Sequence, residues 1–167
     1  MDLEKIAPII EQIIKETLEA KRYPFGFAKF QGTGNKVASG KLRDSVNVTS
    51  TTDGSDAILQ IVMLDYFQWV QSGRLPGKKF VPVGALIQWI KDRKIPIRNK
   101  KTGRFAKKTP DAIKSMAFAI QKNINKFGIR PANFLDVSIE TIMDDSRITE
   151  LLGDATYDDL INAIQGI

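Results

Sequence analysis

The chain contains 167 residues, of which 43% are hydrophobic and 26% are charged, so it can bury one sizeable core and is short for two. Histidine and cysteine are absent, which excludes disulfides, thiol nucleophiles and metal sites built on imidazole or thiolate. Apolar runs fall short of the roughly 20 residues of a spanning helix, and residues 1–5 carry mixed charge. We therefore expect no membrane span, no secretory signal and an intracellular site of folding.

The net charge of +6 is distributed unevenly along the sequence. Residues 73–108 carry 12 basic side chains and a single acidic one, Asp92, which gives +11, and residues 109–132 add +3. Residues 1–72 carry −1, and residues 133–167 carry −7. A basic middle and an acidic tail favour contact with a polyanion or with an oppositely charged protein surface.

An amphipathic helix is predicted at the N-terminus, where apolar residues recur at helical spacing from Leu3 to Leu18. Pro8 lies inside this pattern and lacks a backbone donor, so the helix either begins near Pro8 or kinks there. Residues 22–41 lose the periodicity and contain four glycines and one proline, which predicts a long loop.

A β-hairpin is predicted after this loop. Val46 and Val48 alternate with polar residues, as in a half-exposed strand, and Asp53-Gly54 is typical of a tight hairpin turn. The returning strand, residues 57–64, is apolar on both faces. Such a strand lies either inside a sheet or against a partner subunit, and the sequence leaves both interpretations open.

Both tryptophans lie in residues 65–96, in two short segments of helical period that are separated by a loop containing glycines and prolines. Gly73 is suited to end the first helix, and Pro82 is suited to begin the second. Large aromatic side chains supply much of the buried area of a small core. We therefore expect Trp89 to pack inside.

A basic loop with one aromatic residue, Phe105, is predicted over residues 98–108. The next three residues, Thr109-Pro110-Asp111, have the features of a helix start, namely a capping hydroxyl, a proline and a carboxylate at the positive end of the dipole. This helix should run to Phe127 and end at Gly128, which tolerates the left-handed backbone of a helix C-terminus.

Two blocks of packing and turn residues stand out in this region. The first reads Tyr66-x-x-x-Val70-x-x-Gly73-Arg74, followed by Pro76-Gly77-Lys78-Lys79 and by Pro82-Val83-x-Ala85-Leu86-x-x-Trp89-Ile90. The second reads Met116-Ala117-Phe118-Ala119-Ile120, then Ile124, Gly128-Ile129-Arg130-Pro131 and Phe134-Leu135. Over roughly residues 40–143, this pattern resembles the head–tail joining (neck or tail-completion) proteins of tailed bacteriophages.

The resemblance implies a structural and non-enzymatic role without a cofactor. It implies a subunit of a ring at the neck of the virion, around the DNA channel, which joins the portal side of the head to the tail. The expected partners are further copies of the chain, the portal-side and tail-side virion proteins and, by sequence-independent contact, genomic DNA. The expected location is the virion, assembled in the cytoplasm of the bacterial host.

Two sets of residues are candidates for contacts. Complementary charge can orient neighbouring subunits, which favours a subunit interface made by residues of the basic middle and the acidic tail: Arg74, Lys78, Lys79, Asp158, Asp159, Leu160 and Ile164. The basic loop can instead neutralise phosphates while its aromatic ring stacks on a base, or it can contact a subunit. Its residues are Arg98, Lys100, Lys101, Arg104, Phe105, Lys107 and Lys108.

An enzyme is the third class. Hydrolysis by carboxylates alone and a magnesium site assembled in three dimensions stay open for it, but the sequence singles out no pair of carboxylates. The run from Gly32 to Leu42 resembles a phosphate-binding loop, but Asn35 stands where a glycine is required and Leu42 where a hydroxyl is required. The pairs Asp144-Asp145 and Asp158-Asp159 lack the glycine and the spacing of a calcium loop.

The fold class predicted from these elements is α+β. A small antiparallel β-sheet should pack against the long N-terminal helix and the long central helix, residues 109–127. Residues 1–145 should form a single domain of this kind, and residues 146–167 an acidic helical C-terminal arm that the domain does not need for folding.

Overall fold

The structure, a computed structural model, describes residues 3–20, 22–24, 33–53, 56–98 and 102–152. It confirms the α+β class, because these residues form helices and antiparallel strands in separate parts of the chain. In chain order the elements are α1 (Leu3–Glu19), β1 (Tyr23–Pro24), β2 (Thr33–Gly34), α2 (Lys41–Ser45), β3 (Asn47–Asp53), β4 (Asp56–Val62), α3 (Phe67–Ser72), α4 (Val83–Asp92), α5 (Pro110–Phe127), α6 (Phe134–Met143) and α7 (Ser146–Leu152).

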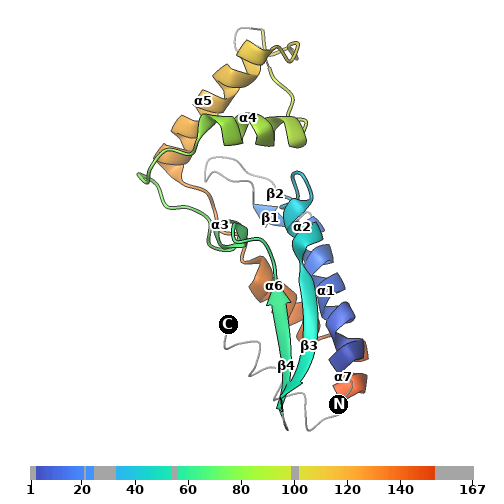
Figure 1. Cartoon of the computed structure of the whole chain (residues 1–167). Coiled ribbons are helices and arrows are strands. Elements are labelled where there is room, and N and C mark those ends of the chain that lie inside the picture. The colour runs from blue at the N-terminus through green and yellow to red at the C-terminus, as the bar shows by residue number, and fades with distance from the viewer. Residues whose placement is uncertain (1–2, 21, 25–32, 54–55, 99–101, 153–167) are drawn as a thin grey trace.

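Two lobes, each with its own hydrophobic core, make up the molecule (Figure 1). We call residues 3–73 and 130–152 the α+β lobe, and residues 74–129 the helical lobe. The expectation that the chain is short for two cores is therefore wrong. The second core is small and consists of residues from α4, α5 and the segment between them: Leu86, Ile90, Ile97, Ile113, Ala117 and Ile124.

Helix α1 is the centre of the α+β lobe. It begins at Leu3 and continues through Pro8, and one face of it is buried against β3, α6 and α7. Pro8 lacks the N–H that would have bonded the Glu4 carbonyl, and the helix continues without that bond. The buried face contains Leu3, Ile6, Ala7, Ile10, Ile13, Ile14, Thr17 and Leu18.

Strands β3 and β4 form the predicted hairpin, in a register that pairs Val48 with Ile61 and Ser50 with Leu59. The face with Leu59 and Ile61 packs on the core, whereas Ile58 and Val62 on the other face are each 48% exposed. In this chain the returning strand is thus buried on one face only. The hairpin turn at residues 54–55 lies outside the described residues.

The long central helix α5 packs on α4, and it does not cover the sheet, so that part of the predicted packing is wrong (Figure 1). Trp89 also departs from expectation, because it is 39% exposed while its neighbour Ile90 is 1% exposed. Helical period alone cannot predict whether Trp89 is buried, because Trp89 lies at the margin of the buried stripe that Leu86 and Ile90 define.

The proposed boundary between residues 145 and 146 does not coincide with a break in the core. Ile148 and Leu152 of α7 are 0% and 8% exposed, and they belong to the core of the α+β lobe. Their burial makes residues 146–152 part of the domain, which corrects the expectation that folding does not need them. Residues 153–167 lie outside the described residues.

Candidate interaction surfaces

The charge asymmetry follows the two lobes. Residues 74–129 contain 15 basic and two acidic side chains, which gives the helical lobe +13. All other residues together contain 10 basic and 17 acidic side chains, which gives −7. A protein with one strongly basic and one acidic part has a large charge separation and can attract either a polyanion or the opposite part of a second copy.

The basic loop is anchored at both ends. Arg98 and Phe105 face each other in an isolated β-bridge, and the Ala106 N–H donates to the Ile97 carbonyl at 2.8 Å. The guanidinium of Arg98 lies 4.7 Å from the centre of the Phe105 ring, which is 68% exposed. One face of this ring is therefore covered by a cation, as in a cation–π contact.

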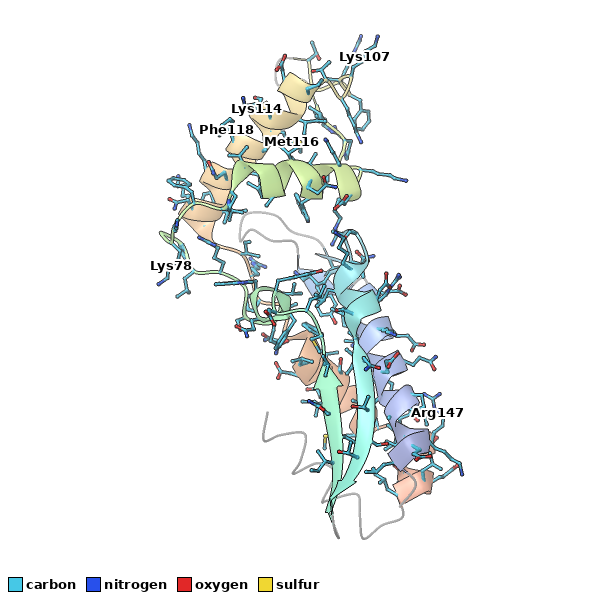
Figure 2. All side chains as sticks on the ribbon, viewed as in Figure 1. Lys78, Lys107, Lys114, Met116, Phe118 and Arg147 are labelled. Carbon is cyan, nitrogen blue, oxygen red and sulfur yellow. The ribbon has the colours of Figure 1, made fainter. Side chains whose placement is uncertain are left out.

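The other residues predicted for this loop divide into two groups. Arg104, Lys107 and Lys108 are exposed, and the Lys108 ammonium donates to the Lys94 carbonyl at 3.0 Å. Lys100 and Lys101 lie outside the described residues. The described part of the loop thus presents Arg98, Phe105 and three further cations together at one end of the helical lobe, where Figure 2 labels Lys107.

The predicted subunit contacts do not all lie on a free surface. Arg74 is half-buried at the junction of the lobes, and its side chain donates to the Lys79 carbonyl. Lys78 and Lys79 are exposed, and the Lys78 carbonyl accepts a hydrogen bond of 2.8 Å from the Asn125 side chain. Asp158, Asp159, Leu160 and Ile164 lie outside the described residues.

A basic stripe on α5 was missed by the sequence analysis. Lys114, Phe118, Lys122 and Lys126 are exposed and recur every four residues, on a stripe that starts beside the buried residues at Lys114 and lies opposite them at Lys122 and Lys126. In Figure 2, Lys114 and Phe118 follow one another along one side of α5, whereas Met116 lies toward α4. Phe118 is 43% exposed. The signal was present in the sequence as lysines spaced by eight and four residues.

An acidic stripe on α6 was also missed. Asp136, Glu140 and Asp144 are exposed and recur every four residues, while Phe134, Ser138 and Ile142 are buried on the opposite face. Asp136 accepts a hydrogen bond of 3.1 Å from the Gln71 side chain. Within the described ranges, no lysine or arginine pairs with any of the three carboxylates.

Exposed apolar side chains lie on both lobes. On the α+β lobe they include Ile58, Val62 and Leu64 of the hairpin, with Tyr66 and Trp69 just beyond it. In the part of the chain that the structure describes, β4 pairs with β3 alone, so its other edge carries unpaired backbone groups. On the helical lobe the exposed apolar residues are Leu75, Phe80, Trp89, Phe105, Phe118 and Phe127.

The lobes meet at a polar contact as well as through the chain. The Arg93 guanidinium at the end of α4 donates to the Asn35 side-chain oxygen at 3.0 Å and to the Asn35 carbonyl at 2.6 Å. Burial lowers the pKa of Arg93, and burial together with the charge of Arg93 lowers the pKa of Lys36. The Lys36 ammonium lies 5.8 Å from the centre of the Tyr23 ring. This junction concentrates positive charge between the lobes.

Within the described ranges, no cluster of three or more acidic side chains is arranged to hold a metal ion. No helix there is both long and apolar enough to cross a membrane. Comparisons of the chain with protein-family models, with curated proteins and with solved structures return no match.

Proposed function

We propose that this chain is the subunit of a non-enzymatic ring in the neck or connector of a tailed-phage virion, where it joins the portal side of the head to the tail around the DNA channel. The observation that carries the proposal is the division of charge between the two lobes, +13 on the helical lobe and −3 on the α+β lobe, with a further −4 on residues 1–2 and 153–167. This division supports head-to-tail contact between copies, and such heterologous contacts close into rings when the rotation permits.

The exposed apolar residues of the hairpin support the same proposal. Ile58 and Val62 lie on the outer face of β4, on either side of the exposed Gln60, and Leu64 follows the strand; their exposed fractions are 48%, 48% and 41%. A partner subunit is the second of the two interpretations that the apolar pattern of this strand allows. Exposed apolar side chains that lie near one another are typical of protein–protein contact sites.

A second candidate function is sequence-independent nucleic-acid binding by the basic loop. The specific observation in its favour is Phe105, whose exposed ring stacks with Arg98 on one face and leaves the other for a base. Replacing Lys100, Lys101 and Arg104 with glutamine should weaken DNA binding and flatten its dependence on salt. Unchanged binding with an unchanged salt slope would remove the loop from this role.

Averaged electron-microscope images of the purified full-length chain, with DNA mobility-shift assays beside them, distinguish the two functions. Closed rings of uniform size are the result expected for a neck subunit. A compact monomer that shifts DNA would favour the nucleic-acid module, and it would contradict the ring.

A further inference from the structure

The basic stripe on α5 and the acidic stripe on α6 carry opposite charges, and the separation of Lys114 from Lys122 equals that of Asp136 from Asp144. Lys114 and Lys122 are eight residues apart, as are Asp136 and Asp144, and eight helical residues span about 12 Å. Asp144 continues the geometry of α6, because its backbone is helical although it caps the helix. The carboxylates of α6 therefore recur at intervals of about 6 Å along the helix axis, whereas the lysines of α5 are separated by about 12 Å and then by about 6 Å.

The two stripes do not meet within one chain. Helix α5 belongs to the helical lobe and α6 to the α+β lobe, and the two helices lie in different parts of the molecule (Figure 1). None of Lys114, Lys122 and Lys126 forms an ion pair with another described residue. The Lys126 ammonium instead lies 5.1 Å from the centre of the neighbouring Phe127 ring.

We propose that the α5 stripe of one copy docks on the α6 stripe of a second copy, and that this contact is a repeating joint of the ring. The proposal rests on the proposed function, and it names the two surfaces that would hold neighbouring subunits of the ring together. In a ring this contact is heterologous, since each copy offers its α5 stripe to one neighbour and its α6 stripe to the other. Phe118, in the middle of the basic stripe, supplies the apolar contact that exposed ion pairs lack.

Charge complementarity favours a second copy over DNA as the occupant. A polyanion would match the α5 stripe alone and would leave the regular spacing of Asp136, Glu140 and Asp144 without a role. A second copy satisfies both stripes with one contact, in which carboxylates of α6 face lysines of α5. Complementary charges of this kind fix orientation and exclude wrong partners.

Charge reversal provides the test, with the oligomeric state of the full-length chain measured by sedimentation. Variant A carries Lys114→Glu and Lys122→Glu, and variant B carries Asp136→Lys and Glu140→Lys. Each variant alone should associate at least about tenfold more weakly than the native chain, because like charges then face one another. All four positions are exposed, so the variants should melt close to the native temperature.

Mixing variants A and B in equal amounts is the decisive step. The α5 stripe of variant A is then acidic and matches the reversed α6 stripe of variant B, while the two native stripes match each other. Association should return to near the native level, with the two variants alternating. As a control, Lys41→Glu with Lys91→Glu makes the same change in net charge as variant A at exposed positions outside both stripes, and it should leave assembly unchanged.

The outcomes separate this contact from the ring itself. Rings that persist in both variants would overturn the α5–α6 contact and leave the ring intact. A native chain that stays monomeric would overturn the ring and the contact together. Weak association of variant A, with no recovery on mixing and with loss of DNA binding, would assign the α5 stripe to DNA and overturn the contact.

Discussion

The backbones of Arg74 and Ile129 exchange two hydrogen bonds of 2.8 Å each, and this pair closes the helical lobe on itself. The two residues are the first and last of the lobe, so 56 residues leave and return at neighbouring points of the α+β lobe. Elements whose ends lie together in this way are typical of insertions into a parent domain. The pairing explains how a short chain supports two cores.

Gly73 precedes Arg74, and Gly128 precedes Ile129. Because neither glycine has a side chain, the two backbone segments can approach closely. A Cβ on Gly73 would lie 2.4 Å from the Ile129 carbonyl oxygen, and one on Gly128 would lie 2.3 Å from the Arg74 carbonyl oxygen. Both residues have positive φ, at 69° and 70°. Each change to alanine should lower the free energy of unfolding by more than about 2 kcal/mol, through backbone strain together with the clash.

Gly77 is the matched control for these two substitutions. Its φ is also positive, at 73°, but a Cβ there meets no atom within 4 Å. Gly77→Ala should cost about 1 kcal/mol, from backbone strain alone. Urea denaturation curves of the three variants measure the losses in free energy of unfolding. Equal losses would show that the clash with the opposite backbone segment adds nothing to the cost of the alanine at positions 73 and 128.

Ile90 should matter more to stability than its larger neighbour Trp89. Ile90 is 1% exposed inside the core of the helical lobe, so Ile90→Ala should cost about 3 kcal/mol. Trp89 is 39% exposed, and Trp89→Ala should cost about 1–2 kcal/mol. Denaturation curves of the two variants decide the order, and a larger loss for Trp89→Ala would place its indole in the core after all.

Two truncations test where the folded domain ends. A chain that stops after Asp145 loses Ile148 and Leu152 from the core, and it should melt well below the native chain. A chain that stops after Leu152 keeps both residues and should melt at nearly the native temperature. If the second chain also fails to form rings, residues 153–167 take part in assembly. Equal melting of both truncations would contradict the assignment of α7 to the domain.

Glu11 predicts part of the dependence of stability on pH. Its carboxylate accepts hydrogen bonds from the Lys15 ammonium at 2.5 Å and from the Val48 N–H at 3.1 Å, and so ties α1 to the edge of β3. The bond from Lys15 is the main cause that lowers the pKa of Glu11, and the bond from Val48 adds to it. A lowered pKa means that the folded state stabilises the charged carboxylate more than the unfolded state does.

This contribution is present above the unfolded pKa of about 4.3 and is lost as the pH falls through the lower folded value. Glu11→Gln should therefore reduce stability by about 1 kcal/mol at neutral pH, and the difference from the native chain should shrink below about pH 4. Thermal melts at several pH values measure it. Glu150→Gln, a substitution at an exposed position of α7, is the control. The same pH dependence in this variant would show that the effect does not come from the hydrogen bonds of Glu11.

Local signals in the sequence were sufficient where neighbours along the chain decide the structure. The Thr109 hydroxyl oxygen accepts from the Ala112 N–H at 3.2 Å, Pro110 is the first residue of α5, and Gly128 ends the helix with a positive φ. Gly73 and Pro82 likewise lie at the end of α3 and the start of α4. The positions of these helix ends were confirmed because caps, prolines and glycines act within one turn, although Gly128 has ψ −167° and so does not adopt the left-handed helical conformation that was predicted.

Features that depend on distant residues were not predicted. The pairing of Arg74 with Ile129 joins positions 55 residues apart, and nothing in either segment alone indicates it. Trp89 and Leu86 both fit the helical period, yet the position of α5 decides which of them is buried. The stripes on α5 and α6 were visible as spacings, but their significance came from finding the two helices in separate lobes of opposite charge.

Assembly of oppositely charged lobes is the central claim, and the mass of the native chain in solution tests it most directly. Native mass spectrometry and sedimentation at low salt should give one closed multiple of the 18.7 kDa chain. At about 1 M NaCl, where the Debye length is about 3 Å, this species should dissociate toward single chains. A chain that remains at 18.7 kDa at every concentration and at low salt would contradict the account.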